Sequence, residues 1–459
     1  MKNIILIIAD QLRYDVIGET KKYPVHTPNL DALCRDGYFF NRGYTQSPVC
    51  APARTAILSG KIPEKSGAIA NPGLFPERFL LPEDFNFVKT LRQNGYETRH
   101  FGKWGITDRF SPCEYGFDSH VSFAEYGKKY PSEKSTLSGV EYFKDCRPDT
   151  SPSPSVGEWL AENAAENIKT ADRPFYMQIE FSETHVPFIP KEKYYNMYKD
   201  LKIDPPYSFM NEKFINKPYI QKQQMYSWNI ENDGFDVFAE RLRCYFALVT
   251  QLDAAVGMIT GALKEKGLYN DTIIIFTADH GEMCGSHRMH EKHYVMYDDV
   301  VRVPFILKGT ENEHKSFGDA LVNASLDIAP TLFSLCGIET PDGAGLDGKS
   351  LAPLLTGETG EGAFREFLCA SYNGAQFGLY TQRMIIKDNI KYIWNLTDVD
   401  ELYDLEKDGY ECENLVYDEK YADILKGRRR ELYCELERLG DRLCVNAWCE
   451  NQLLNNKIY

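Results

Sequence analysis

Two nearly continuous hydrophobic runs stand far apart in the chain and end in the same way. They read NIILIIADQ at 3–11 and TIIIFTADH at 272–280, and each passes from isoleucines to Ala-Asp followed by a second polar residue. A hydrophobic run of this length is typical of a strand that is buried on both faces of a parallel sheet. We therefore predict two core strands, each of which delivers a carboxylate to the edge of a sheet.

Segments with the period of strands and of helices alternate between these two runs. Further strands are predicted at 38–44, 97–105 and 174–182. Helices are predicted at 27–37, 50–60, 84–94, 156–169 and 236–266, several of them followed by a glycine in the C-cap position. This alternation predicts an α/β fold with a mostly parallel central sheet and helices on both faces.

Three parts of the chain depart from this alternation. Residues 125–155 and 186–235 are rich in Tyr, Lys, Pro, Ser and Asn, and we expect long loops over one edge of the sheet. Beyond about residue 360 the pattern changes to an antiparallel hairpin at 383–395 and a helix at 422–443. We predict a large domain over residues 1–360 and a smaller C-terminal α+β subdomain over residues 361–459.

Charge and cysteine usage narrow the class of protein. The formal net charge of −15 excludes a general nucleic-acid or anionic-membrane surface. The first hydrophobic run is too short for a signal peptide, and no later run approaches the roughly 18 apolar residues of a membrane-spanning helix. The 12 cysteines form no CxxC pair and are expected to be free thiols in a reducing compartment. We expect a cytoplasmic protein with neither nucleic acid nor membrane as partner, and nothing in the sequence specifies an oligomeric state.

The ends of the two core strands carry a candidate metal site. The potential ligands are Asp10, Gln11, Asp279 and His280. In a parallel sheet the carboxyl ends of neighbouring strands meet at one edge, where two close carboxylates repel each other unless a cation lies between them. A hard, oxygen-rich site favours calcium, magnesium or manganese. One aspartate alone would more simply end a strand or cap a turn, but the matched pair favours a metal.

The stretch SPVCAPARTAILSG at 47–60 suggests a site for an anion. Pro52 fits the first turn of a helix and Gly60 its C-cap, so Cys50 falls at the helix N-terminus. Free N–H groups and the helix dipole favour an anion at that end. Cationic or protic groups on this helix, after two other strands and in the loop after the second core strand would complete a cluster suited to a tetrahedral oxyanion. They are Arg54, Lys103, His185 and Lys292.

A third pattern is the spacing of His287, His290 and His293, which resembles that of a zinc cluster. No cysteine stands at ligand spacing beside them, so a zinc site is not predicted. We expect these histidines to line a substrate pocket or to lie on the surface.

The motifs resemble, as an ordered set, those of the type I sulfatases. CAPAR at 50–54 matches the signature C-x-P-x-R, and the other family motifs follow in the family's order over about residues 1–355: ADQ, GKWG, THVP, ADHGEM and VRVP, with a weaker echo in DELYDL at 400–405. The pairing of Gln11 with His280 resembles the branch that includes choline sulfatases and phosphonate monoester hydrolases. Gly105 stands where many members have a histidine.

This resemblance implies a fold, a reaction and a set of roles. It implies an alkaline-phosphatase-like catalytic domain over residues 1–360 that hydrolyses small-molecule or saccharide sulfate monoesters to an alcohol or phenol and inorganic sulfate. It also implies a divalent metal, calcium before manganese or magnesium. Cys50 would be converted to formylglycine by a formylglycine-generating or anaerobic sulfatase-maturating enzyme. The implied roles are these: Cys50 as modified nucleophile, Arg54 to hold it, Asp10, Gln11, Asp279 and His280 on the metal together with Cys50, Lys103 and Lys292 on sulfate, and His185 at the leaving group.

Two other functions remain open at this point. The same machinery would serve a hydrolase of phosphonate monoesters or phosphate diesters. If Cys50 stays a thiol, the chain would be a non-catalytic binder of sulfated ligands.

Overall fold

The computed structural model describes residues 1–459 except 74–78, 132–145, 310–314, 377, 456 and 458–459. Its largest element is an eight-stranded sheet in the order β4-β3-β5-β1-β6-β7-β2-β8. The strands are β1 (Asn3–Ala9), β2 (Tyr38–Tyr44), β3 (Glu97–Gly102), β4 (Ser119–Val121), β5 (Phe175–Phe181), β6 (Thr272–Ala278), β7 (Phe305–Lys308) and β8 (Lys315–Asn323). Neighbouring strands are parallel except where β7 pairs with β6 and β2, which confirms the predicted mostly parallel sheet.

The two hydrophobic runs lie side by side in the middle of this sheet. β1 and β6 are parallel and in register, with Ala9 opposite Ala278, and every residue of both strands is buried. Continuous burial on both faces explains why neither strand shows alternation in its sequence. Because the two strands end at the same level, Asp10 and Asp279 leave the sheet next to each other.

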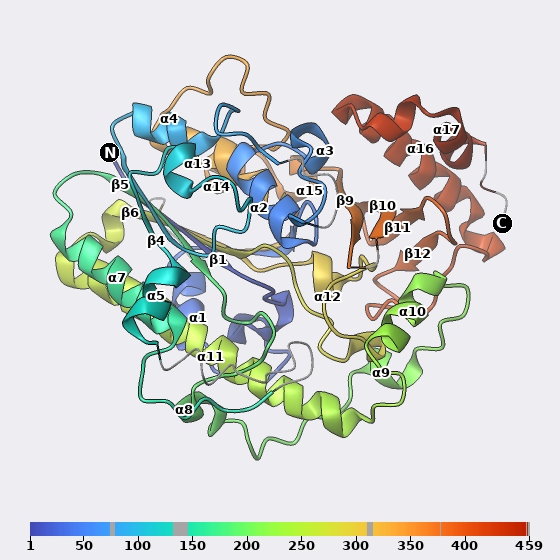
Figure 1. Cartoon of the computed structure of the whole chain (residues 1–459). Helices are drawn as coiled ribbons and strands as arrows, with labels where there is room; N and C mark the ends of the chain where they lie inside the picture. The colour runs from blue at the N-terminus through green and yellow to red at the C-terminus, as the bar shows by residue number, and fades with distance from the viewer. Residues whose placement is uncertain (74–78, 132–145, 310–314, 377, 456, 458–459) are drawn as a thin grey trace.

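Helices cover both faces of the large sheet, as predicted. One face carries α2 (Cys50–Ser59), α4 (Phe87–Gln93) and α13 (Ile328–Cys336), and the other carries α1 (Pro28–Asp36), α7 (Val156–Thr170) and α11 (Phe235–Lys266) (Figure 1). By length and composition α11 could cross a membrane, but 78% of its most apolar window is buried inside the protein. That burial, and its packing along α7, is what a core helix requires.

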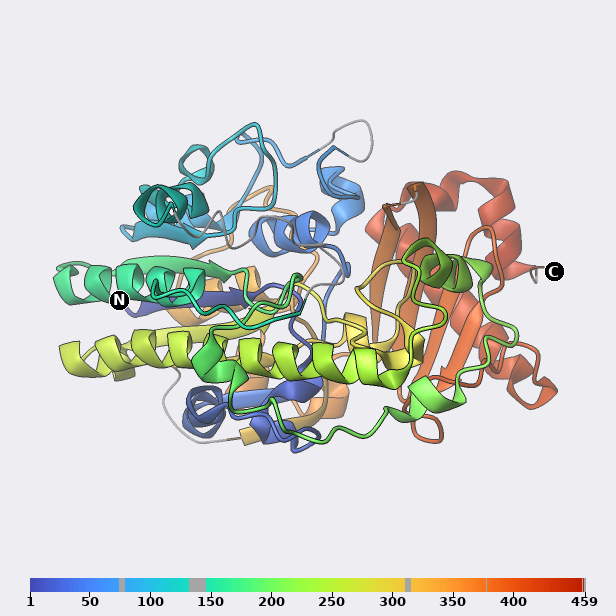
Figure 2. The same cartoon turned by 60° about the horizontal axis from the view of Figure 1, so that its bottom comes forward.

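The C-terminal part forms a separate four-stranded antiparallel sheet, in the order β12-β11-β10-β9. Its strands are β9 (Phe367–Ala375), β10 (Gly378–Lys387), β11 (Ile390–Asn395) and β12 (Glu401–Asp404), and α16 (Ala422–Leu439) and α17 (Ala447–Leu454) follow. α16 packs on β10 and β11, so the predicted hairpin and helix are confirmed. Figure 2 shows this subdomain beside the large sheet. The boundary at residue 360 stays a prediction; it falls where α15 (Glu361–Phe364) begins.

Some local predictions were wrong. The helix expected at 84–94 begins only at Phe87, because the Asn86 side chain accepts a hydrogen bond from Lys89 N at 3.1 Å and caps the first turn. The expected loop at 186–235 contains α8 (Glu192–Tyr195), α9 (Tyr207–Asn211) and α10 (Tyr219–Ser227), the last two directly after Pro206 and Pro218. Of the expected loop at 125–155, residues 132–145 lie outside the described residues, and α5 (Phe123–Lys129) occupies its start.

The remaining elements are short. They are α3 (Pro63–Ser66), α12 (Asp298–Val301), α14 (Ala352–Leu355) and the 3₁₀ helices η1 (Tyr14–Val16), η2 (Gly18–Thr20), η3 (Pro112–Tyr115), η4 (Tyr269–Asp271), η5 (Ser286–Arg288), η6 (Glu419–Tyr421) and η7 (Arg442–Val445).

Candidate active site

Four potential metal ligands converge at the carboxyl ends of β1 and β6. One ligand atom from each of Asp10, Cys50, Asp279 and His280 lies within 4.8 Å of the other three, and all four residues are buried. Two carboxylates, an imidazole and a sulfur that meet in so small a volume are a donor set for a divalent cation. The structure thus brings together three of the four sequence-predicted metal ligands with the candidate nucleophile.

The ring of His280 is turned so that one nitrogen faces the cluster. Its Nδ1 lies 3.0 Å from the carbonyl oxygen of Gly281, which can only accept, so Nδ1 carries the proton. Its Nε2 then presents a lone pair 3.6 Å from Asp279 Oδ1, 3.7 Å from Asp10 Oδ1 and 3.3 Å from Cys50 Sγ. A backbone carbonyl that fixes the tautomer in this way is the usual support of a histidine metal ligand.

Gln11 borders the cluster, but its side chain has other partners here. Its backbone N–H donates to Asp279 Oδ1 at 3.1 Å, from a left-handed backbone conformation with φ of 65°. Its side-chain oxygen accepts from Lys292 Nζ at 2.7 Å, and its amide nitrogen donates to Glu282. The role of Gln11 as a metal ligand therefore stays a prediction.

Cys50 is the first residue of α2, as the sequence predicted. Gly60 ends the helix at φ of 65°, and its N–H donates to Ala56 O. Ala51 N donates to Asn71 Oδ1 at 3.0 Å, so a side chain satisfies one of the free N–H groups of the first turn. Burial raises the pKa of the Cys50 thiol, but the charges of two nearby lysines outweigh it and bring the pKa well below its usual value. The sulfur therefore lies in a strongly cationic environment.

Arg54 contacts the carboxylates rather than the cysteine. Its side chain is fully buried, and Nη2 lies 2.9 Å from Asp279 Oδ2 and 3.5 Å from Asp10 Oδ2. Its Nη1 pairs with Glu180, a residue of β5. In the described part of the chain the ion pairs of Arg54 run to these three carboxylates, so the implied role of holding Cys50 would be indirect.

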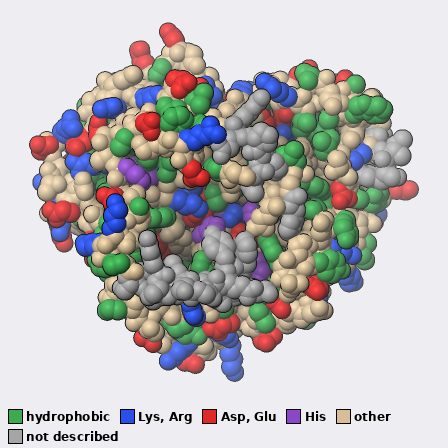
Figure 3. Space-filling model, viewed as in Figure 1, with side chains coloured by type: hydrophobic (Ala, Val, Ile, Leu, Met, Phe, Trp, Pro, Cys, Tyr) green, Lys and Arg blue, Asp and Glu red, His purple; other side chains and the backbone are tan. Residues whose placement is uncertain are grey.

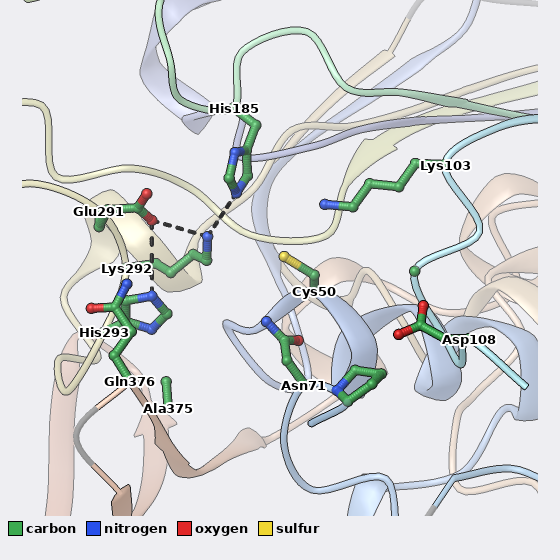
Figure 4. A pocket seen from close by; sticks show the side chains of 12 residues that line it. Cys50, Asn71, Lys103, Asp108, His185, Glu291, Lys292, His293, Ala375 and Gln376 are labelled. Carbon is green, nitrogen blue, oxygen red and sulfur yellow. Dashed lines mark hydrogen bonds and ion pairs between the residues drawn. The ribbon is translucent and has the colours of Figure 1, made fainter. Parts of the chain in front are cut away.

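The three remaining candidates surround Cys50 (Figure 4). Lys103 reaches in from one side and contacts Asp10 Oδ2. Lys292 and His185 reach in from the other side, with Lys292 Nζ 3.2 Å from His185 Nε2. His185 Nδ1 lies 2.8 Å from the carbonyl oxygen of Val186, which orients the ring. The structure thus brings all three side chains to one place, although Lys103 follows β3, His185 follows β5 and Lys292 lies in the long loop after β6.

These groups line a cavity of about 310 Å³ that opens to the surface. Figure 3 shows a hollow on this face, with histidine and cationic side chains at its bottom. The lining residues are Cys50, Asn71, Pro72, Lys103, Gly105, Asp108, His185, Glu291, Lys292, His293, Ala375 and Gln376. Most of them are charged or polar, and Ala375 and Gln376 come from the end of β9 in the C-terminal subdomain. The cavity can therefore hold an anionic group at its base and a polar group above it.

The three spaced histidines do not meet. His293 lines the cavity, as one of the two expectations had it, whereas His287 pairs with Glu212 and His290 contacts Arg241. All three are buried, so the alternative of a plain surface position was wrong.

The two metal-site carboxylates differ in their electrostatic surroundings. Burial raises the pKa of Asp10, but the charges of Lys103 and His185, with others, outweigh it and hold the pKa well below its usual value. Burial also raises the pKa of Asp279, and the charge of Asp10 adds to that increase. Two close carboxylates whose pKa values are pushed apart are a common feature of catalytic sites.

Several residues of this site were missed in the sequence. Glu180, Glu282 and Glu291 are buried acids that contact Arg54, Gln11 and Lys292 respectively. Glu282 falls within the motif ADHGEM, and Glu180 left a signal as a charged residue inside the buried strand FYMQIEF. A charge at a fully buried strand position requires a partner, and the sequence alone did not indicate which one.

Comparison with known proteins agrees with this geometry. The sulfatase family model matches residues 2–338, and the model of the C-terminal region of N-sulphoglucosamine sulphohydrolase matches residues 285–438. The chain is 27% identical to an arylsulfatase of Clostridium perfringens over 95% of this chain and 94% of that protein. It is also 27% identical to a choline-sulfatase of Rhizobium meliloti over 90% of this chain and 82% of that protein.

Among solved structures, the phosphonate monoester hydrolase of Agrobacterium radiobacter superposes with a TM-score of 0.79 at 23% identity, over 96% of each chain. This likeness confirms the fold that the resemblance implied. Since the sulfatase model covers more than half of the sequence and its signature cysteine lies at the metal-ligand cluster, the chain belongs to the sulfatase family, the sulfuric ester hydrolases of the alkaline phosphatase superfamily.

Proposed function

We propose that this sulfatase hydrolyses sulfate monoesters with a formylglycine derived from Cys50 and a divalent cation held beside it. The observation that carries the proposal is the position of Cys50 at the N-terminus of α2. Its Sγ lies 3.3 Å from His280 Nε2 and 3.9 Å from Asp10 Oδ1. A nucleophile that adjoins both a metal-ligand cluster and a helix N-terminus is placed to attack an anionic ester.

The donor set fits a divalent cation. Asp10, Asp279 and His280 each aim one atom at a common region, and two buried carboxylates so close need positive charge between them. Oxygen donors favour calcium, with manganese and magnesium next because His280 adds a nitrogen. When bound, such a cation supplies charge that stabilises the transferring sulfuryl group and favours an ionised nucleophile.

The side chains around Cys50 would transfer protons and bind the sulfate group. Formylglycine, as its hydrate, would supply one hydroxyl for attack on sulfur and a second whose loss of a proton would re-form the aldehyde and release sulfate by C–O cleavage. Asp279 is placed to accept the proton of the attacking group. The ammonium groups of Lys103 and Lys292 flank the cavity base and donate to the sulfate oxygens, where charge develops. His185, on the wall of the cavity, supplies the proton that the leaving oxygen needs.

Cys50→Ala tests the proposal. It should abolish turnover while the protein remains folded, and the wild-type peptide that contains residue 50 should be about 18 Da lighter than its unmodified form. Cys34→Ala is the matched control, because Cys34 is equally buried but lies in α1. Retained activity in Cys50→Ala would rule out the mechanism. An unmodified thiol together with tight binding of sulfated ligands and no turnover would support a binding protein instead.

A second candidate function is the hydrolysis of phosphonate monoesters or phosphate diesters. It is favoured by the Gln11 and His280 pairing and by the similar fold of the phosphonate monoester hydrolase. The same cation, lysines and nucleophile would act on phosphorus. The ratio of kcat/KM for an aryl sulfate and an aryl phosphonate ester, measured on formylglycine-verified enzyme, separates the two functions.

We also propose a cytoplasmic location and maturation by a formylglycine-generating or anaerobic sulfatase-maturating enzyme. The location is supported by the twelve cysteines, none of which forms a disulfide in the described structure. Cell fractionation tests the location, and the formylglycine content of protein made with and without each maturase tests the maturation partner.

A further inference from the structure

A row of polar side chains crosses the large sheet from the active site to its edge. His120 lies on the edge strand β4, His100 on β3 and Glu180 on β5, and these three strands are consecutive in the sheet. His100 stands directly opposite His120 in the register. His100 and Glu180 are completely buried, and His120 is half-buried. Polar groups at such positions need a complete set of partners.

The contacts along this row form one directed chain. Arg54 Nη1 forms an ion pair with Glu180 Oε2. His100 Nε2 lies 3.2 Å from Glu180 Oε1, and because a carboxylate accepts, Nε2 carries the proton. His100 Nδ1 is then the acceptor for His120 Nδ1, which lies 2.9 Å away. Each link is satisfied with both rings neutral.

The packing around His100 keeps this arrangement in place. The rings of Trp104 and Phe117 meet the imidazole edge-on, with centroids at 5.3 and 5.2 Å. Burial holds the pKa of His100 well below its usual value, and the neighbouring His120 and Arg54 add to that decrease. A neutral ring that is held by two aromatic side chains can serve as a fixed donor to Glu180.

At the Arg54 end of this row of contacts, the two oxygens of each metal-site carboxylate have different partners. Arg54 Nη2 forms ion pairs with Asp279 Oδ2 at 2.9 Å and with Asp10 Oδ2 at 3.5 Å. The other oxygen of each carboxylate, Oδ1, is the one near His280 Nε2. The guanidinium therefore acts together with Lys103, which also contacts Asp10 Oδ2, and with the backbone N–H groups of Gln11 and His280, which donate to Asp279 Oδ1. Together these groups set which oxygen of each carboxylate faces the cluster.

The side-chain amide of Gln178, on the same strand, also donates to Glu180 Oε1. We propose that Glu180, held by Gln178 and by His100, which His120 supports in turn, is a positioning residue that sets Arg54 and so helps to aim Asp10 and Asp279 at the cation. The inference rests on the metal site of the proposed function. Glu180 also supplies a third carboxylate beside Arg54. Without that negative charge the guanidinium charge would act more strongly on the neighbouring cation and weaken its binding.

Calcium affinity of the metal-stripped protein, measured by titration calorimetry, tests this role. Glu180→Gln should weaken calcium binding by about 10- to 100-fold, the range found when the partner of a metal ligand is removed. The control is Glu183→Gln, the same substitution just after the same strand. Glu183 is also buried, but its carboxylate accepts from Gly157 N at 2.6 Å and touches none of these groups. Glu183→Gln should bind calcium as the wild type does.

The histidine link is tested by a pair of variants at residue 100. His100→Leu removes the donor to Glu180 and should weaken calcium binding, whereas His100→Gln keeps an N–H at a similar reach and should restore most of the affinity. Should Glu180→Gln fail to fold, this pair carries the comparison by itself. Formylglycine content is verified by mass in every variant, so that a maturation defect is not mistaken for a metal defect.

Unchanged calcium affinity in Glu180→Gln would overturn the proposal, and so would equal losses in Glu180→Gln and Glu183→Gln. A wild-type protein that binds no divalent cation would overturn it together with the metal site. Failure of the proposed function would give a different result: the wild type would bind calcium but hydrolyse no sulfate ester. The calcium affinities of Glu180→Gln and Glu183→Gln would then still decide the role of Glu180.

Discussion

Replacement of His185 should separate substrates by their leaving groups. His185→Ala is expected to slow the hydrolysis of alkyl and sugar sulfates far more than that of nitrophenyl sulfate. An alkoxide needs a proton in the transition state, whereas nitrophenolate leaves without one. The ring of His185 is fixed by the contact of Nδ1 with Val186 O at 2.8 Å, and its Nε2 lies 3.2 Å from Lys292 Nζ. Because Val186 O can only accept, Nδ1 carries a proton, and Nε2 faces the Lys292 ammonium at the wall of the cavity.

The expected loss of rate in His185→Ala is the contribution of a general acid. General-acid assistance is worth about 100- to 10,000-fold in rate, which corresponds to about 2.7 to 5.4 kcal/mol of barrier. Lys292→Ala should slow both substrate classes, because the ammonium also lies beside Gln11 Oε1 at 2.7 Å and faces the sulfate position. Residues in direct contact are usually coupled by about 0.5–3 kcal/mol. The double variant should therefore lose less on a sugar sulfate than the product of the two single losses.

The assay compares kcat/KM for a sugar sulfate and nitrophenyl sulfate in the two single variants and the double variant. All enzymes need equal formylglycine content by mass. Equal losses for both substrate classes in His185→Ala would remove the acid role and leave His185 as a sulfate contact. Selective loss in Lys292→Ala would exchange the two roles. Fully multiplicative losses would refute the coupling between His185 and Lys292.

Three further predictions concern the metal, the backbone and pH. Asp279→Ala should lower metal content as well as activity, and full occupancy by elemental analysis would contradict the site. Gly105→Ala should lower the free energy of unfolding in urea by about 1–2 kcal/mol because its φ is +60°, whereas Gly427→Ala, in the open interior of α16, should raise it by about 0.5–1 kcal/mol. Burial raises the pKa of Glu212, but a hydrogen bond from His287 and a neighbouring lysine ammonium outweigh it and bring the pKa to about 2. Because the folded-state pKa is lowered, this stabilisation is complete above the ordinary value of 4.5 and is lost as the pH falls toward 2. Glu212→Gln should therefore be less stable than the wild type at neutral pH, and urea unfolding should show the gap closing over that range.

The sequence by itself determined the elements that carry the reaction. The hydrophobic runs at 3–11 and 272–280 require strands that are buried on both faces. A strand that ends in Ala-Asp places its carboxylate at the edge of the sheet. The spacing of Cys50, Pro52 and Gly60 specified α2 and its N-terminal cysteine, because capping and first-turn preferences are local. These features depend on neighbours in the chain, so the chain order was enough to predict them.

Only the tertiary structure decided how these elements are connected across the site. The strand order places β5 and β3 between β1 and the edge, and that order alone turns Glu180 and His100 into partners of Arg54. The fold also brings the side chain of Gln11 into hydrogen-bond contact with Lys292 and Glu282, which are more than 270 positions away in the sequence. The physical reason is that a buried charge or hydrogen-bonding group is stabilised by whichever group meets it in space. A polar residue within a buried strand indicates that a partner is required, and the fold brings that partner from a distant segment of the chain.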